Sequence, residues 1–231
     1  GVGEGRAAGP EPSGVAPTPD RSPTGGGFLG EWVDGLGVIW RDRRLRWGLV
    51  VAGLASVAQG IFVVLFVLFV TRVLGGGGAE VGLLRGVQAV GGLLGGVLVV
   101  GAARRLEPGR LLGGSLLAFG GIALTCWNSP QLTTAMWWYL GLFVAAGIPG
   151  VGVLSALTAL VQAQADDAYL GRVFATFFGV EAGLQAVGIL LAGLLGDPVG
   201  VVPVLNGQAV LYLLTGLLAL ATLGRRAQGA Y

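Results

Sequence analysis

Long apolar stretches alternate with short polar segments along most of the chain. Six of these stretches carry almost no charge, and each is close to the ~20 residues that a helix needs to cross the hydrocarbon core of a membrane. A segment inside lipid has to satisfy its own backbone hydrogen bonds, which favours helices over strands. The sequence therefore predicts an all-α, polytopic membrane protein. Its six transmembrane helices are expected at residues 47–70, 80–103, 111–127, 135–161, 171–196 and 204–223.

The residues before the first apolar stretch divide into two parts. Residues 1–27 are rich in proline, glycine, serine and threonine and have no apolar period, which predicts a disordered linker. Residues 28–46 place apolar side chains at helical spacing between charged ones, which predicts an amphipathic helix in the cytoplasmic membrane interface. A soluble partner helix is the alternative. The six-helix bundle is expected to cover residues 47–226, and residues 227–231 to form a cytoplasmic tail.

The composition limits the chemistry that the chain can perform. Hydrophobic residues make up 54% of the chain and charged residues 11%, whereas soluble domains are about 25% charged. All basic residues are arginine, and there is neither lysine nor histidine. A Walker A loop needs a lysine, and imidazole acid–base pairs and metal sites need histidine. We therefore expect no enzyme, no cofactor and no metal site.

Most arginines fall on one side of the predicted helices. They precede the first span, separate the second from the third, open the fifth and follow the sixth, whereas Arg72 stands alone on the other side. Positively charged loops stay in the cytoplasm, so both termini are expected to be cytoplasmic in a multi-pass protein of the cell (inner) membrane. Because topology explains the arginines, the net charge of +2 does not indicate nucleic-acid binding.

Two charged side chains interrupt the apolar stretches. Arg85 lies about six residues into the second span and Glu181 about ten residues into the fifth, which places them at similar depths. Ionisable groups inside a membrane are costly and often mark transport pathways. Glu181 is therefore a candidate proton-coupling residue. A permanent Glu181–Arg85 pair that joins two helices and an Arg85 that snorkels to the outer interface are the alternatives.

Three glutamines add polar groups within the spans. Gln59, Gln88 and Gln185 are predicted to line a cavity, or else to form hydrogen bonds between helices. Gln185 shares a helix face with Glu181, and Gln88 shares one with Arg85. The spacing therefore gathers the polar groups of each helix on one side.

A proline lies between glycines in the middle of the fourth predicted span. Proline removes a helical hydrogen bond and bends a helix. Gly147, Pro149 and Gly150 therefore predict either a hinge that bends during transport or a static kink.

Three segments at the predicted membrane surface resemble parts of a known transporter family. Residues 31–46 resemble the segment that leads into the seventh helix of macrolide-efflux-like drug/proton antiporters of the major facilitator superfamily. Residues 160–175 resemble the loop between helices ten and eleven of that branch, and residues 104–110 resemble the family's cytoplasmic Gly/Arg loop. The motif residues are Arg104, Arg105, Gly109, Arg110, Gly171 and Arg172.

The order and spacing of these segments resemble the C-terminal half of a major facilitator protein over about residues 28–226. The resemblance implies a secondary transporter that exports a small amphipathic compound in exchange for protons, by alternating access. It also implies a missing N-terminal six-helix half as partner, because such proteins bind substrate between two halves. The membrane subunit of an ATP-driven transporter and a nontransporting membrane scaffold protein are the alternatives.

Overall fold

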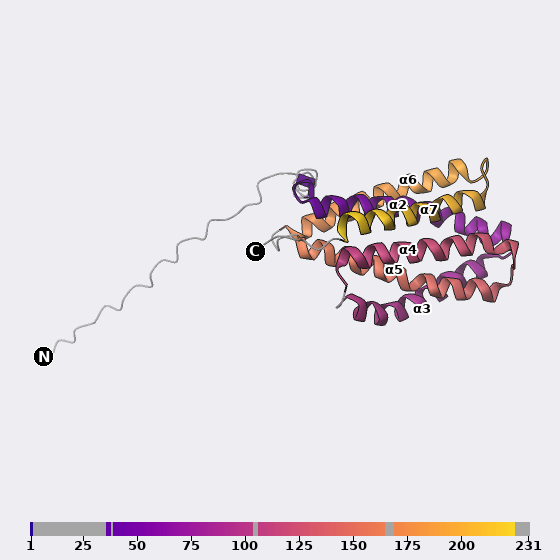
Figure 1. The fold of residues 1–231 in the computed structure, drawn as a ribbon, viewed down its shortest axis with the longest axis horizontal. Coiled ribbons are helices and arrows are strands. Elements are labelled where there is room, and N and C mark those ends of the chain that lie inside the picture. The colour runs from indigo at the N-terminus through magenta and orange to yellow at the C-terminus, as the bar shows by residue number, and fades with distance from the viewer. Residues whose placement is uncertain (2–35, 38, 104–105, 165–168, 225–231) are drawn as a thin grey trace.

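Six long helices make up the bundle (Figure 1). The computed structural model describes residues 1, 36–37, 39–103, 106–164 and 169–224, and these residues form no strand. Each long helix has the length and apolar composition to cross a membrane, which confirms the prediction of an all-α bundle with six candidate spans and fits a multi-pass membrane protein. The helices are α2 (Arg43–Leu68), α3 (Gly78–Ala103), α4 (Pro108–Asn128), α5 (Met136–Gln164), α6 (Leu170–Leu195) and α7 (Val201–Leu223).

The first long helix begins earlier than predicted. The side chain of Asp42 accepts hydrogen bonds from the backbone nitrogens of Arg44 and Leu45, at 2.6 and 2.9 Å. Such an acceptor satisfies backbone donors that have no partner inside the helix. Arg43, Arg44 and Arg46 therefore belong to α2 and not to the predicted interfacial helix. Within the predicted interfacial helix, the structure describes 36–37 and 39–46, and all of these residues except Asp42 are helical. The predicted linker, apart from Gly1, lies outside the described residues.

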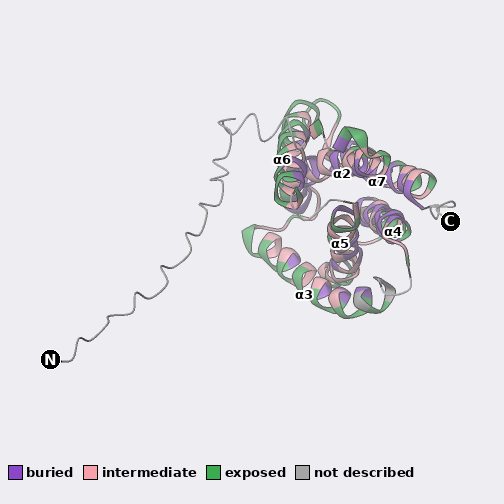
Figure 2. Cartoon of the chain, turned by 90° about the vertical axis from the view of Figure 1, so that its left-hand side faces the viewer, coloured by how far each residue is buried: buried purple, intermediate pink, exposed green. Residues whose placement is uncertain are grey.

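Seen along the helix axes, the bundle consists of two rows (Figure 2). In one row α2 packs between α6 and α7, and in the other α5 packs between α3 and α4. The pair α4 and α7 joins the rows along one side, whereas α2 and α5 contact each other only slightly. The two middle helices therefore face each other across the space between the rows.

The last three helices, α5, α6 and α7, occupy places equivalent to those of the first three, α2, α3 and α4. The contacts of α2 with α6 and α7 correspond to those of α5 with α3 and α4. A unit of three helices ends on the side of the membrane opposite to where it started, so the second unit is inverted relative to the first. The bundle is thus two inverted three-helix units, related by a pseudo-two-fold axis between the rows.

The corresponding helix crossings carry matching sequences. Residues 88–91 of α3 and 185–188 of α6 both read Gln-Ala-Val-Gly. On the facing helices, residues 57–61 of α2 read Val-Ala-Gln-Gly-Ile and residues 144–148 of α5 read Val-Ala-Ala-Gly-Ile. The internal repeat therefore lies where the helices cross.

Glycine allows the backbones to approach at both crossings. A Cβ on Gly60 would collide with the backbone oxygen of Gln185, and a Cβ on Gly147 would collide with that of Gln88. Small residues promote close helix packing in lipid in this way. Gly60 and Gly147 are therefore equivalent packing positions in the two units.

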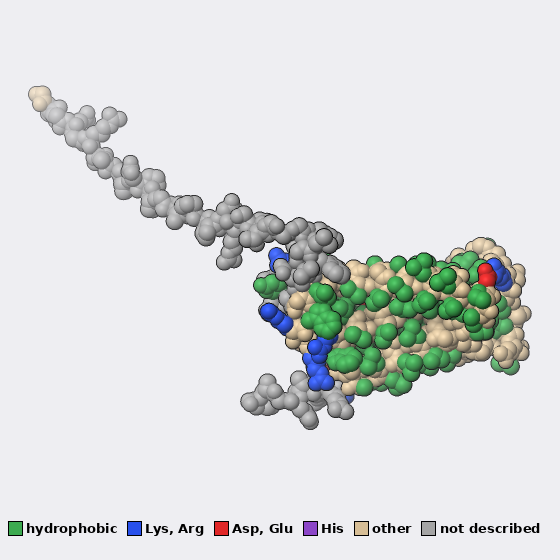
Figure 3. All heavy atoms as spheres, turned by 90° about the horizontal axis from the view of Figure 1, so that it is seen from above, with side chains coloured by type: hydrophobic (Ala, Val, Ile, Leu, Met, Phe, Trp, Pro, Cys, Tyr) green, Lys and Arg blue, Asp and Glu red, His purple; other side chains and the backbone are tan. Residues whose placement is uncertain are grey.

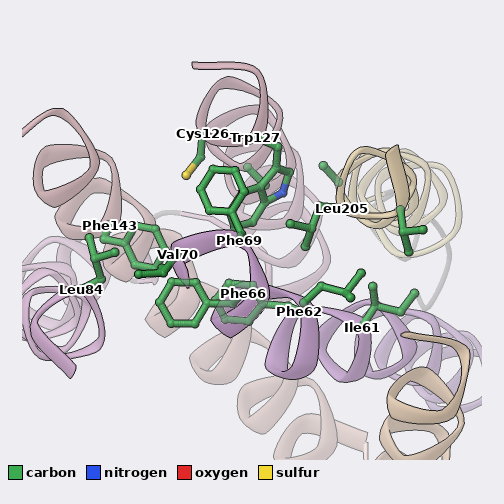
Figure 4. Packing of buried hydrophobic residues seen from close by; sticks show 14 of the residues in the cluster. Ile61, Phe62, Phe66, Phe69, Val70, Leu84, Cys126, Trp127, Phe143 and Leu205 are labelled. Carbon is green, nitrogen blue, oxygen red and sulfur yellow. The ribbon is translucent and has the colours of Figure 1, made fainter. Parts of the chain in front are cut away.

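Aromatic side chains fill the interior near the end of α2 (Figure 4). The rings of Phe66 and Phe143 lie 5.1 Å apart, and Phe69 meets Trp127 edge-on at 4.9 Å. Phe69 belongs to the π-helical turn Phe69–Val73 that extends α2. These contacts fix α2 against α4 and α5 at this end of the bundle.

Arginines gather at the opposite end, where α2, α4 and α6 begin (Figure 3). The described arginines of this end, which we call the arginine-rich end, are Arg41, Arg43, Arg44, Arg46, Arg110 and Arg172. At the other end Arg72 forms an exposed ion pair with Asp197, with 2.9 Å between Nη1 and Oδ1. The charges thus follow the asymmetry that the sequence predicts.

Candidate functional site

A cavity of about 490 Å³ lies between the two rows. Its wall includes residues of α2, α4, α5, α6 and α7. Sites for small organic ligands usually measure about 300–1,000 Å³ and combine apolar walls with a few polar groups. The cavity has this character, because aliphatic and aromatic side chains surround Gln59, Glu181, Gln185 and Tyr212.

Glu181 carries the charge of this cavity. It is half-buried on α6, and the cavity wall includes no other charged residue among those that the structure describes. Its carboxylate makes no hydrogen bond and no ion pair with a described residue. Gln185 follows one turn later on the same helix face and also lines the cavity. The two side chains offer a carboxylate and an amide to a ligand.

Gln59 and Tyr212 form the opposite polar wall. The hydroxyl of Tyr212 donates a hydrogen bond of 3.0 Å to Oε1 of Gln59. The ring of Phe119 meets the Tyr212 ring edge-on, with 5.0 Å between the centroids. These contacts fix the amide of Gln59 at the cavity wall. Sequence reasoning missed Tyr212 and Phe119; the signal for Tyr212 was a hydroxyl in the middle of a largely apolar span.

Arg85 lies outside the cavity and is not paired with Glu181, although both residues are described. Its guanidinium lies 4.5 Å from the ring centroid of Phe62 and 5.1 Å from that of Phe66. Its Nη1 also donates to Oε1 of Gln88, at 3.4 Å. A cation over aromatic faces gains electrostatic stabilisation without a carboxylate. The Glu181–Arg85 ion pair, one of the alternatives for these residues, does not form, because α3 and α6 hardly contact each other.

Gln88 lines a separate, smaller cavity. This cavity has a volume of about 20 Å³ and is walled largely by aromatic and aliphatic residues, including Phe62, Trp127 and Phe143. A volume of that size holds about one water molecule. The structure therefore places Gln59 and Gln185 together and Gln88 apart from them.

Helix α5 runs through the predicted hinge without ending. Pro149 lies inside the helix, Gly147 lies at the crossing with α3, and Gly150 lines the large cavity. Bending at this point stays a prediction.

The predicted loop motifs lie at the arginine-rich end. Gly109 packs tightly against the backbone of Leu223, and Nε of Arg110 donates to the backbone oxygen of Gly224 at 3.0 Å. Gly171 and Arg172 are exposed at the start of α6. Arg104 and Arg105 lie outside the described residues. The Gly109–Arg110 segment therefore holds the start of α4 against the end of α7.

Gln208 is a second polar residue that sequence reasoning missed. It is buried on α7, and its Oε1 accepts a hydrogen bond of 3.2 Å from Nε1 of Trp127. This bond joins α4 and α7 inside the aromatic core. Its sequence signal was an amide within a span, the same signal that indicated the other glutamines.

The described residues contain no group of three histidine, cysteine, aspartate or glutamate side chains that could hold a metal ion. No family model, no curated protein and no solved structure matches the chain. The inverted repeat and the cavity are therefore the features of the molecule that bear on its function.

Proposed function

We propose that the chain is the C-terminal half of a secondary active transporter of the major facilitator type. The inverted repeat carries this proposal, because secondary transporters are commonly built from inverted three-helix units around a site near the middle of the membrane. The cavity around Glu181, Gln185 and Gln59 lies between the two units, where such a site is expected. The chain would then supply half of a binding site for a small amphipathic compound.

The large exposed apolar surfaces of α3 and α6 are a reason to propose a partner half that packs against them. Only 17% of the apolar window of α3 and 11% of that of α6 is buried, compared with 56% for α2. Large apolar side chains such as Leu93, Val97, Leu190 and Leu194 are exposed on these helices. A second six-helix half packed across the cavity would cover part of this surface, and lipid would cover the remainder.

Glu181 is the residue that we propose for proton coupling. A carboxylate within a membrane-spanning helix is costly when it is charged and has no partner. It can lose that cost by binding a proton or by facing a bound cation. Exchange of the proton during the transport cycle would couple export to the proton gradient.

The arginine-rich end indicates the orientation. By the positive-inside rule this end lies in the cytoplasm, so both termini would be cytoplasmic in the cell membrane. The compound would then leave through the end that carries the Arg72–Asp197 pair.

The two alternatives have less support. The membrane subunit of an ATP-driven transporter needs long cytoplasmic segments to engage an ATPase, whereas α3 and α4 are separated by residues 104–107 and α5 and α6 by residues 165–169. A nontransporting scaffold needs no cavity, whereas this cavity holds a carboxylate that has no partner among the described residues. The scaffold alternative therefore leaves the cavity between the inverted units unexplained.

Transport by the full-length protein in proteoliposomes tests the proposal. A panel of fluorescent amphipathic compounds would be screened for movement that depends on an imposed pH gradient and stops when a protonophore is added. Glu181→Gln should abolish the pH dependence, and Glu181→Asp should keep part of it. Unchanged pH-driven transport in Glu181→Gln would reject proton coupling through this residue, and transport that requires ATP hydrolysis would reject the class.

A further inference from the structure

A groove separates α3 from α4 at the arginine-rich end, although these helices follow each other in the chain. The groove has a volume of about 280 Å³ and lies on the outer surface of the bundle, away from the cavity around Glu181. Leu98 of α3 and Leu106 stand exposed along it, and Ile148 and Pro149 of α5 line it from behind. Its wall is mainly apolar, which suits a hydrocarbon occupant.

The shape of the groove suits one acyl chain. Gly114 forms part of its wall, and a Cβ at this position would meet no atom within 4 Å. Along α4 the groove runs from Arg110 to Ala118, about 12 Å at 1.5 Å per residue. Half the hydrocarbon core of a bilayer is about 15 Å thick. The groove therefore covers most of the depth of a single leaflet.

Arg110 places a positive charge at the membrane-surface end of the groove. The bond from its Nε to the Gly224 oxygen holds the guanidinium in place, and its Nη groups donate to no described residue. Residues 104–110 contain three arginines and one glutamate, so the segment has a net positive charge. Arginine binds phosphate with two parallel hydrogen bonds, and basic pockets between transmembrane helices bind anionic headgroups.

We propose that this groove binds one anionic phospholipid from the leaflet at the arginine-rich end. An acyl chain lies along Gly114, and the headgroup phosphate accepts hydrogen bonds from the Nη groups of Arg110. The proposal needs only that the chain spans a membrane, and it does not depend on transport.

Native mass spectrometry of the purified, delipidated chain tests the proposal. The chain would be titrated separately with phosphatidylglycerol and with phosphatidylcholine of the same acyl chains. We expect the first phosphatidylglycerol to bind about fivefold more tightly, because one arginine contributes roughly this factor to anionic-lipid binding. Equal binding of the two lipids by the unmodified chain would overturn the proposal.

Matched variants separate the charge from the groove. Arg110→Gln should lose the preference for phosphatidylglycerol, whereas Arg172→Gln, at the same end of the bundle, should keep it. Gly114→Leu should fill the groove and weaken the first binding event for both lipids. Gly121→Leu adds the same side chain two turns away on the same face, where a Cβ also meets no atom within 4 Å, and should leave lipid binding unchanged. The proposal would be contradicted if Arg172→Gln changed the lipid preference as much as Arg110→Gln, or if Gly121→Leu weakened lipid binding as much as Gly114→Leu.

Two further measurements serve as controls for these lipid titrations. Melting temperatures of all variants identify any that fail to fold, and Arg110→Gln tests the charge independently of groove filling. Excess inorganic phosphate should leave phosphatidylglycerol bound, because phosphate has no acyl chain. Displacement by phosphate would reject the lipid site and leave a simple anion site.

Discussion

The two helix crossings of the bundle share their backbone packing and differ in their polar side chains. At the α2–α6 crossing, Gln59 and Glu181 line the large cavity. The repeat places Ala146 at the position equivalent to Gln59 and the buried Leu84 at the position equivalent to Glu181. The packing glycines are the same in both units, because a Cβ at either position would collide with backbone.

The shared glutamine has different surroundings in the two units. Gln185 lines a cavity of about 490 Å³, whereas Gln88 accepts a hydrogen bond from Arg85 and lines a pocket of about 20 Å³. One repeated sequence therefore lines a large cavity with several polar groups in one row and a small, mainly aromatic pocket in the other. Under the proposed function, the α2–α6 crossing would bind the ligand and the α3–α5 crossing would support the fold.

The largest expected loss of stability comes from adding a methyl group at each of the two helix crossings. Gly60→Ala and Gly147→Ala would each drive a methyl group into a backbone oxygen of the facing helix. Overpacking of this kind costs about 1–3 kcal/mol, and backbone atoms cannot move aside as a flexible side chain can. Both variants should lower the unfolding free energy of the purified protein in mixed micelles by similar amounts.

Glycines with open surroundings on the facing helices, α3 and α6, provide the control. A Cβ on Gly86 or Gly183 would meet no atom within 4 Å. Alanine favours helix over glycine by about 1 kcal/mol, so Gly86→Ala and Gly183→Ala should be neutral or stabilising. If Gly60→Ala and Gly147→Ala were as stable as these controls, the packing role of the repeat would be wrong.

A smaller effect is expected from Arg85, which has no charged counterpart in the second unit. Arg85→Met keeps an extended side chain but removes the cation above Phe62 and Phe66. Cation–π contacts contribute about 0.5–2 kcal/mol, so the unfolding free energy should fall by about 1 kcal/mol. An unchanged unfolding free energy would show that the aromatic contacts do not stabilise the fold.

Replacing Gln88 and Gln185 should change the unfolding free energy less than the substitutions above do, and by different amounts at the two crossings. Gln88→Leu removes the acceptor for Arg85, a bond within α3, and should cost about 0.5 kcal/mol, as for other side-chain pairs three residues apart on a helix. Gln185→Leu removes no described hydrogen bond and should leave stability unchanged while it impairs transport by the full-length protein. If Gln185→Leu lowered the unfolding free energy and Gln88→Leu did not, the division of roles between the two crossings would be wrong.

The smallest effect is expected outside both crossings, at the exposed Arg72–Asp197 pair. Exposed ion pairs contribute little, because water and salt screen them. Asp197→Asn should therefore change the unfolding free energy by less than about 0.5 kcal/mol. A larger loss would show that this end of the bundle depends on the pair.

The sequence predicted the helices well and the site in part. Six apolar stretches between short polar segments were enough to define the spans, although the cap at Asp42 moved the start of α2. Helical spacing placed Glu181 and Gln185 on one face, but spacing within a helix does not say which helices become neighbours. The Glu181–Arg85 pair, one of the alternatives for these residues, is absent among the described residues, because a similar depth does not show whether two helices contact each other.

The repeat was readable in the sequence and was missed. The two Gln-Ala-Val-Gly segments begin at residues 88 and 185 and occupy equivalent spans of the two units. Glycine is abundant throughout the chain, so matching glycines alone carry little information. The neighbouring Gln, Ala and Val, together with the facing segments at 57–61 and 144–148, make the match specific.

Thiol labelling tests most directly whether one copy of the repeat lines an open polar cavity and the other does not. Gln185→Cys and Gln88→Cys would be made in a Cys126→Ala background and reconstituted in liposomes, since Cys126 is the sole native cysteine. A charged, membrane-impermeant methanethiosulfonate should label the cysteine at position 185 and leave that at position 88 largely unmodified. Equal labelling of the two, or labelling of position 88 alone, would contradict the account.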